Sequence, residues 1–238
     1  MSRRLLIAFL LFLCFTVHSQ SLYFSAGYDL MIPTGGGLND FADKYNSQRA
    51  AILTQKMEAP SMFNGLSFMA GTALGPMILE LGYSSHKGKM SASSNPMATQ
   101  GGATGREINF ENSMFNISIG VLSTDASSET YIVFPSMEAN FYSMNFTTKL
   151  TGVNSAEQKG NVGSFTQVGL GASLMKGFGG TFIIYAKAAY YLDPFKSSFS
   201  DLYRKTSTSY NITDDEDEGS YSGFLLKAGI MLYWNCLQ

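Results

Sequence analysis

Four charged residues lie within otherwise apolar or small-residue segments, and they are the groups best placed to interact with one another. They are Glu80, Glu138, Lys187 and Lys227. Each segment alternates with a period of two, and these charges fall opposite the apolar positions. Unpaired charges in an interior would be costly, whereas carboxylates and ammonium groups can form ion pairs there. We therefore predict a structural charge network inside the protein. A proton or solute path through it is the alternative.

His86 is the only histidine beyond the first 19 residues, so any catalytic histidine must be this one. Ser84 and Ser85 precede it, and Asp29 and Glu80 lie on neighbouring candidate strands. A serine activated by a histidine is the nucleophile of many hydrolases and acyltransferases. However, the chain has no Gly-x-Ser-x-Gly nucleophile elbow. We expect His86 to be a rim residue at a strand end, and we assign no catalytic residue and no enzyme activity.

An acidic run near the C-terminus offers oxygen ligands of the kind that Ca²⁺ and Mg²⁺ favour. It comprises Asp214, Asp215, Glu216, Asp217 and Glu218. The run lacks the alternating ligands and central glycine of an EF-hand, so a solvated loop is the main prediction. A weak divalent-ion site, or a divalent-bridged contact with lipopolysaccharide, is the alternative. The glycines at 35–37 are not followed by the lysine and hydroxyl residue of a phosphate-binding loop, and no cofactor is expected.

The last segment of the chain has the clearest strand pattern. Every second residue from Phe224 to Trp234 is apolar, with Lys227 and Gly229 among the residues between them. A soluble barrel would turn this apolar face inward, whereas a membrane barrel turns it toward lipid. The run KAGIMLYW also resembles the C-terminal insertion signal of outer-membrane barrels, through Lys227, Gly229, Leu232 and Trp234. That resemblance implies contact with the barrel-insertion machinery during assembly.

The start of the chain predicts export. Residues 1–19 have the basic start, apolar middle and small residues of a secretory signal peptide, which leaves 20–238 as one domain. Removing two arginines with the signal changes the formal net charge of −2 to −4. Without a basic patch, nucleic-acid binding is excluded. Only Cys236 then remains, so no intramolecular disulfide can form.

The composition and the spacing of segments predict a membrane barrel. Charged residues make up 14% of the chain, and beyond residue 19 no segment approaches the length of a spanning helix. Candidate strands lie at 21–32, 62–74, 77–87, 107–122, 130–146, 163–175, 181–193 and 220–234. Long connections at 33–61, 88–106, 147–162 and 194–219 alternate with short ones at 75–76, 123–129 and 176–180. This alternation predicts an all-β, eight-stranded antiparallel up-and-down transmembrane β-barrel with long extracellular loops and short periplasmic turns.

Two local features refine this architecture. The segment LNDFADKYNSQRAAI has helical spacing, with Leu38, Phe41, Tyr45 and Ala50 on one face, and it predicts a short helix capping the barrel mouth. Pro135 interrupts the fifth strand, and because proline cannot donate to a ladder we expect a bulge there.

Two further segments resemble motifs of a known family. LELGYSSHKGK (79–89) and YIVFPSMEANFY (131–142) resemble the third- and fifth-strand motifs of the outer-membrane β-barrel domain family of Bacteroidetes, the porin-like and PorT-like barrels. The resemblance implies an outer-membrane barrel. It implies no activity, because most members have none assigned, and the protein-secretion role of PorT itself does not transfer.

These observations together predict a non-enzymatic outer-membrane scaffold. Its extracellular loops would serve surface interaction or envelope integrity. The expected partners are outer-membrane lipids, lipopolysaccharide and an unidentified surface or envelope protein. The alternatives are a barrel-type lipid-modifying enzyme using His86, a soluble lipocalin-like ligand carrier, and passive diffusion of small solutes.

Overall fold

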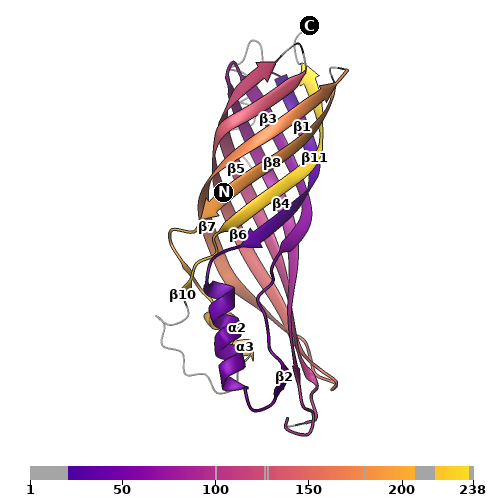
Figure 1. Cartoon of the computed structure of the whole chain (residues 1–238), viewed down its shortest axis with the longest axis vertical. Coiled ribbons are helices and arrows are strands. Elements are labelled where there is room, and N and C mark those ends of the chain that lie inside the picture. Colours follow the sequence, from indigo (N-terminus) through magenta and orange to yellow (C-terminus); the bar gives the residue numbers. More distant parts are fainter. Residues whose placement is uncertain are drawn as a thin grey trace, which may run out of the picture.

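The fold is an antiparallel barrel in which each strand pairs with its neighbours in the chain (Figure 1). The computed structural model describes residues 21–99, 101–125, 127, 129–179, 181–206 and 218–235, without the side chains of Trp234 and Asn235. The barrel strands are β1 (Ser21–Pro33), β3 (Phe63–Leu74), β4 (Met77–Ser94), β5 (Gly105–Asp125), β6 (Thr130–Thr151), β7 (Gln158–Phe178), β8 (Phe182–Leu192) and β11 (Gly223–Asn235). Pairing of β1 with β11 closes the ring. The predicted eight-stranded transmembrane barrel is therefore confirmed.

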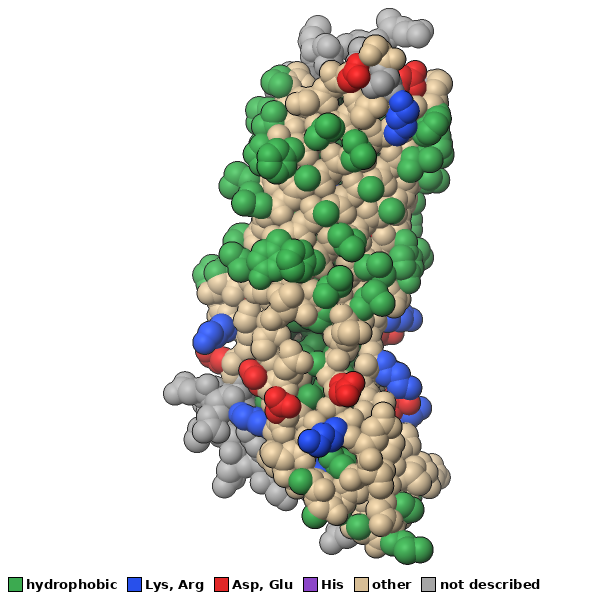
Figure 2. All heavy atoms as spheres, in the orientation of Figure 1, with side chains coloured by type: hydrophobic (Ala, Val, Ile, Leu, Met, Phe, Trp, Pro, Cys, Tyr) green, Lys and Arg blue, Asp and Glu red, His purple; other side chains and the backbone are tan. Residues whose placement is uncertain are grey.

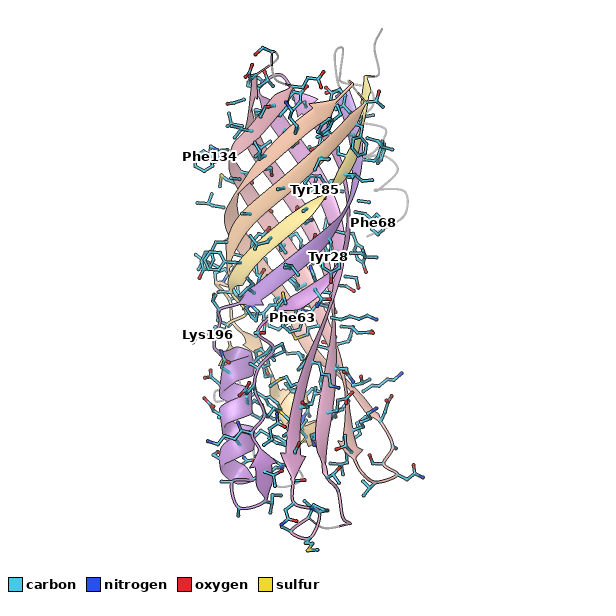
Figure 3. All side chains as sticks on the ribbon, turned by 45° about the vertical axis from the view of Figure 1, so that its right-hand side comes forward. Tyr28, Phe63, Phe68, Phe134, Tyr185 and Lys196 are labelled. Atoms are coloured by element: carbon cyan, nitrogen blue, oxygen red, sulfur yellow. The ribbon has the colours of Figure 1, made fainter. Side chains whose placement is uncertain are left out.

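The barrel wall is apolar outside and polar inside. Large apolar side chains point outward along every strand, among them Leu66, Phe68 and Leu170, which are 60%, 58% and 62% exposed. Figure 2 shows these side chains over the barrel, with Lys, Arg, Asp and Glu gathered at its two ends, and Figure 3 shows Phe68 and Phe134 projecting from the wall. A soluble carrier would have the opposite arrangement, so the lipocalin-like alternative is wrong.

Four strands continue well past the others at one end. β4 to β7 have 18 to 22 residues, whereas β8 has 11 and β11 has 13. The outer parts of these strands are 87–94 in β4, 105–113 in β5, 143–151 in β6 and 158–166 in β7. We call these four parts together the extension. The predictions that 88–106 and 147–162 are long loops were wrong in extent, because strand occupies 88–94 and 105–106 of the first range and 147–151 and 158–162 of the second. In the extension the outward residues are mostly polar and the inward residues mostly apolar, which reverses the pattern of the barrel wall.

The connections at this end cover the inner face of the extension. The cap consists of α2 (Gly37–Gln48), β2 (Leu53–Gln55), β9 (Ser197–Ser198), α3 (Ser200–Thr206) and β10 (Glu218–Gly219). The predicted helix is confirmed, and Leu38, Phe41 and Tyr45 are buried on one face. Ala50 lies beyond the helix and is exposed, so its assignment to that face was wrong. α3 was not predicted. Figure 1 shows both helices beside the extension, at the end opposite the short turns.

The register between strands shifts on both sides of β6 close to Pro135. The β6–β7 register shifts between Val133 and Ser136, and the β5–β6 register shifts between Gly120 and Leu122. The bulge expected at Pro135 is therefore confirmed. Among the described residues, no helix has both the length and the apolar character needed to cross a membrane.

A charge on the apolar band should destabilise the barrel. Leu170→Arg places a guanidinium in lipid and should lower the free energy of unfolding by about 2–4 kcal/mol. Urea unfolding of the protein refolded in phospholipid vesicles measures this. Ser91→Arg, on the exposed face of the extension, is the matched control and should change the value by less than about 0.5 kcal/mol. Equal effects of the two substitutions would contradict a lipid-facing band.

Candidate functional site

The centre of the barrel holds a buried ion triad. Lys187 of β8 places its Nζ 3.1 Å from Oε2 of Glu80 on β4 and 2.9 Å from Oε1 of Glu138 on β6. All three side chains are buried. β4 and β8 lie on opposite sides of the ring, so the lysine bridges the lumen. The structure thus brings together three of the four charged residues that the sequence places inside.

Hydrogen bonds complete the coordination of both carboxylates. Glu80 accepts from the hydroxyls of Tyr23 and Ser118, each at 2.7 Å. The donors to Glu138 are Ser136 at 2.9 Å, Asn116 at 3.2 Å and the hydroxyl of Tyr191. A buried ion pair is tolerated only when its remaining lone pairs are satisfied in this way.

Two inward-facing glycines make room for the tyrosines that reach the carboxylates. A Cβ at Gly71 would lie 2.2 Å from the ring of Tyr23, and a Cβ at Gly169 would lie 2.3 Å from the ring of Tyr191. Real Cβ atoms do not approach other atoms this closely. The glycines therefore set the positions of both phenols, and through them the hydrogen bonding of the triad.

The fourth predicted charge belongs to a second cluster. Lys227 is opposite Lys187 in the β8–β11 register, yet its Nζ lies 3.4 Å from Oδ2 of Asp29 on β1. Asp29 also accepts a hydrogen bond from the hydroxyl of Ser84 at 2.7 Å, and Nε2 of His86 lies 3.5 Å from the same oxygen. The two adjacent lysines are thus held apart by different carboxylates.

The prediction that His86 is a rim residue was wrong. β4 continues to Ser94, and His86 is fully buried in the lumen. In a catalytic triad the histidine lies between the serine and the carboxylate. Here the carboxylate of Asp29 lies between Ser84 and His86. This order leaves the serine donating to a carboxylate, which does not generate a nucleophile through the imidazole.

Aromatic rings close the lumen where the barrel meets the extension. The ring of Tyr221 packs against Phe165, Tyr142 and Phe63 at centroid distances of 5.3, 5.7 and 5.9 Å. Asn112 donates to its hydroxyl at 2.9 Å, and burial raises the pKa of this phenol above its ordinary value. The sequence placed Tyr221 at the start of the last strand but did not reveal this role, because the packing depends on four separate segments.

Two arginines hold α3 in place, one from the cap itself and one from the barrel. Arg49, just after α2, donates to the carbonyl of Thr206 at 2.9 Å, and Arg106 of β5 donates to the carbonyl of Lys205 at 3.4 Å. Both carbonyls lie at the C-terminal end of α3, where cations are favourable. Arg49 also stacks over the ring of Tyr45, with its Cζ 4.2 Å from the centroid. Burial lowers the pKa of Arg106, although a guanidinium stays protonated.

The remaining predicted sites are only partly described. Lys227 points inward and Leu232 outward on β11, while the side chain of Trp234 lies outside the described residues. Recognition by insertion machinery stays a prediction. Asp214, Asp215, Glu216 and Asp217 also lie outside the described residues, and Glu218 is exposed in β10. Within the described part of the chain, no three His, Cys, Asp or Glu side chains are grouped to hold a metal ion.

Comparison with known proteins gives fold-level similarities only. No family model and no curated protein sequence matches the chain. The solved structures similar to it include OprG of Pseudomonas aeruginosa (6% identity, TM-score 0.48, covering 92% of this chain and 97% of that one) and Neisserial surface protein A (9%, 0.44, 90% and 96%). The outer membrane protease OmpT of Escherichia coli is a third (8%, 0.42, 92% and 98%). At these scores the similarities assign no activity, and the barrel architecture rests on the chain's own strand pairing.

Removing the Lys187 ammonium alone should lower the free energy of unfolding more than neutralising all three members of the triad. Lys187→Met leaves two buried carboxylates without a cation and should lower the free energy of unfolding by about 3–5 kcal/mol. Adding Glu80→Gln and Glu138→Gln to the same chain should restore much of that loss. Urea unfolding in vesicles measures both. Lys87→Met removes an exposed ion pair with Glu111 and is the control, expected to cost less than about 1 kcal/mol. A triple variant with a lower free energy of unfolding than Lys187→Met would contradict this account.

Loss of both arginine contacts should loosen α3, and with it the packing of the cap, without unfolding the barrel. In Arg49→Ala with Arg106→Ala, the charge-assisted bonds to α3 disappear, at about 1.5–3 kcal/mol each. Amide exchange in α2 and α3 should become at least about tenfold faster while exchange in β8 and β11 stays unchanged. Arg204→Ala is the control, because this α3 side chain is exposed and, among the described residues, its ion pair is with Asp201 at 3.7 Å. Equal protection in both variants would exclude the two arginines as the groups that hold α3 in place.

Proposed function

We propose that this chain is a non-enzymatic outer-membrane β-barrel with a sealed lumen, whose role lies in the rigid structure that it presents outside the cell. The observation that carries the proposal is the double closure of the barrel. The triad around Lys187 fills its centre, and the rings around Tyr221 fill its cap end. Eight strands leave an interior just wide enough for such filling. Passive diffusion of solutes is therefore disfavoured.

The proposed orientation places the short turns and the C-terminus in the periplasm and the extension outside. An exported barrel protein with an even number of strands returns both chain ends to the same side. The extension and cap then form an ordered body beyond the outer leaflet (Figure 1). Binding sites commonly lie on segments held by a rigid frame, which favours a role in surface interaction or envelope integrity.

Lipopolysaccharide is a proposed partner of the part of the extension that lies next to the barrel wall. Lys87 and Lys89 project outward just beyond the apolar band, where they pair with Glu111 at 3.7 Å and Glu107 at 2.7 Å. Hydrogen bonds from Lys89 and Asn109 lower the pKa of Glu107, so this carboxylate stays ionised. Ammonium groups at this height suit anionic headgroups, and the carboxylates suit bridging divalent ions.

The lipid-modifying enzyme has less support. It requires His86 to activate a serine in contact with a lipid, yet Ser84 and His86 are both fully buried, and Asp29 lies between them. Membership of the Bacteroidetes barrel family also remains part of the proposal. It rests on the two strand motifs, and it brings no secretion role with it.

Labelling of single cysteines tests location and orientation together. In a Cys236→Ser background, Ser91→Cys lies on the extension and Pro76→Cys lies at the β3–β4 turn. A membrane-impermeant maleimide should label Ser91→Cys in intact cells and Pro76→Cys only after the outer membrane is permeabilised. The protein should also fractionate with the outer membrane and migrate faster on a gel when unboiled. The reverse labelling pattern, or a soluble product, would overturn the proposal.

A further inference from the structure

The turn end of the barrel contains a cavity of about 300 Å³ that the charge network does not fill. Its walls come from the ends of the strands next to the short turns and the termini, including Ala73, Ile78 and Met175. This places the opening at the end opposite the cap. The volume lies at the lower limit of small-molecule sites.

The inside of this cavity is apolar. Met175, Met231, Ile78 and Ile183 line it and are buried in a common cluster. Methionine side chains adapt to chains of different shape because they are unbranched and polarisable. The inner wall is Tyr23, whose hydroxyl is already used by Glu80. A ligand would therefore contact hydrocarbon side chains along the cavity. At its inner end it would reach Tyr23, whose hydroxyl already donates to Glu80.

The mouth is polar and carries one negative charge. Glu129, Tyr131 and Tyr233 lie around it. The carboxylate of Glu129 sits over Gly177, where a Cβ would be 3.2 Å from its Oε2, and Gly177 donates its N–H to the carbonyl of Glu129 at 2.8 Å. Within the described residues, no salt bridge neutralises Glu129.

The backbone at Glu129 is strained in a way that a glycine would avoid. Its φ is 48°, in the left-handed region that L-residues with a Cβ seldom occupy. Such positions cost about 1 kcal/mol or more and concentrate at ligand-binding sites. The carboxylate is thus held at the mouth at an energetic cost, which is an observation independent of the cavity itself.

We propose that this cavity binds a small amphiphile with an unbranched apolar chain and a cationic head. The chain lies between Met175 and Met231, and the head pairs with Glu129 at the mouth, where Tyr131 and Tyr233 offer hydroxyl acceptors. An anionic head would face the unneutralised carboxylate. The site goes beyond the scaffold function, and it depends on the proposed orientation only for the compartment that supplies the ligand, which would be the periplasm.

Methyl NMR of the protein in lipid nanodiscs tests the site directly. With ¹³C-methyl methionine, n-octylammonium should produce saturable shifts at Met175 and Met231. Met144, in the apolar core beneath the cap, should not respond. Met77 and Met137 face lipid and report simple partitioning, which does not saturate. Octanoate, with the same chain length and the opposite charge, should bind at least about tenfold more weakly.

Two variants separate the cavity from its charge. Ala73→Leu fills the cavity and should abolish the saturable shifts, whereas Ala188→Leu, which adds the same bulk on the lipid face, should leave them unchanged. Glu129→Gln is exposed, should fold normally, and should weaken octylammonium binding about tenfold. Non-saturating shifts, equal binding of octanoate, or unchanged binding in Glu129→Gln would each overturn the proposal. The cysteine-labelling pattern is independent of these results, so failure here leaves the outer-membrane assignment intact.

Discussion

The bridge from β8 to β4 through Lys187 is the interaction on which the rest of the barrel depends. An eight-stranded ring leaves an interior just wide enough for side chains, so a charge buried in it needs an opposite charge from another strand. Lys187 satisfies Glu80 and Glu138 together, and the tyrosine and serine hydroxyls satisfy the oxygens that remain. This requirement in turn explains the glycines opposite Tyr23 and Tyr191. A lumen organised in this way is a structural element rather than a passage.

The second constraint is a reversal of polarity along single strands. In β5 the inward residues Ile108, Phe110 and Met114 are apolar, and from Phe115 to Val121 the outward residues are apolar instead. The alternation of faces continues without a break at this point. What changes is the surroundings, because the barrel wall faces lipid and the extension faces water. The chain therefore contains a polar core at the centre of the barrel, which lipid encloses, and apolar cores at both ends, one covered by the cap and one next to the short turns.

This reversal also explains what the sequence could and could not predict. The outward apolar face identified the eight strands, and helical spacing identified α2. Beyond the band, the same strands continue with the apolar face inward, so a lipid-facing stripe alone predicts strands that end too early. Partners across the lumen were beyond reach for another reason. Glu80 and Lys187 are 107 positions apart, and pairing of Asp29 with Lys227 follows only from the β1–β11 register. Periodicity gives the face of a residue but not its neighbour on another strand.

The cap follows from the extension rather than from an independent function of the loops. A sheet with an apolar inner face in water must be covered, and α2 and α3 bury Phe41, Leu202 and Tyr203 against it. The connections that contain these helices are therefore part of a packed core and are poorly suited to be freely variable binding loops. The outward face of the β4–β7 extension does not need to be covered in this way, and neither do the connections at 95–104 and 152–157. The surface interaction proposed above would therefore involve this polar sheet and its tips rather than the cap, with the barrel acting as the anchor.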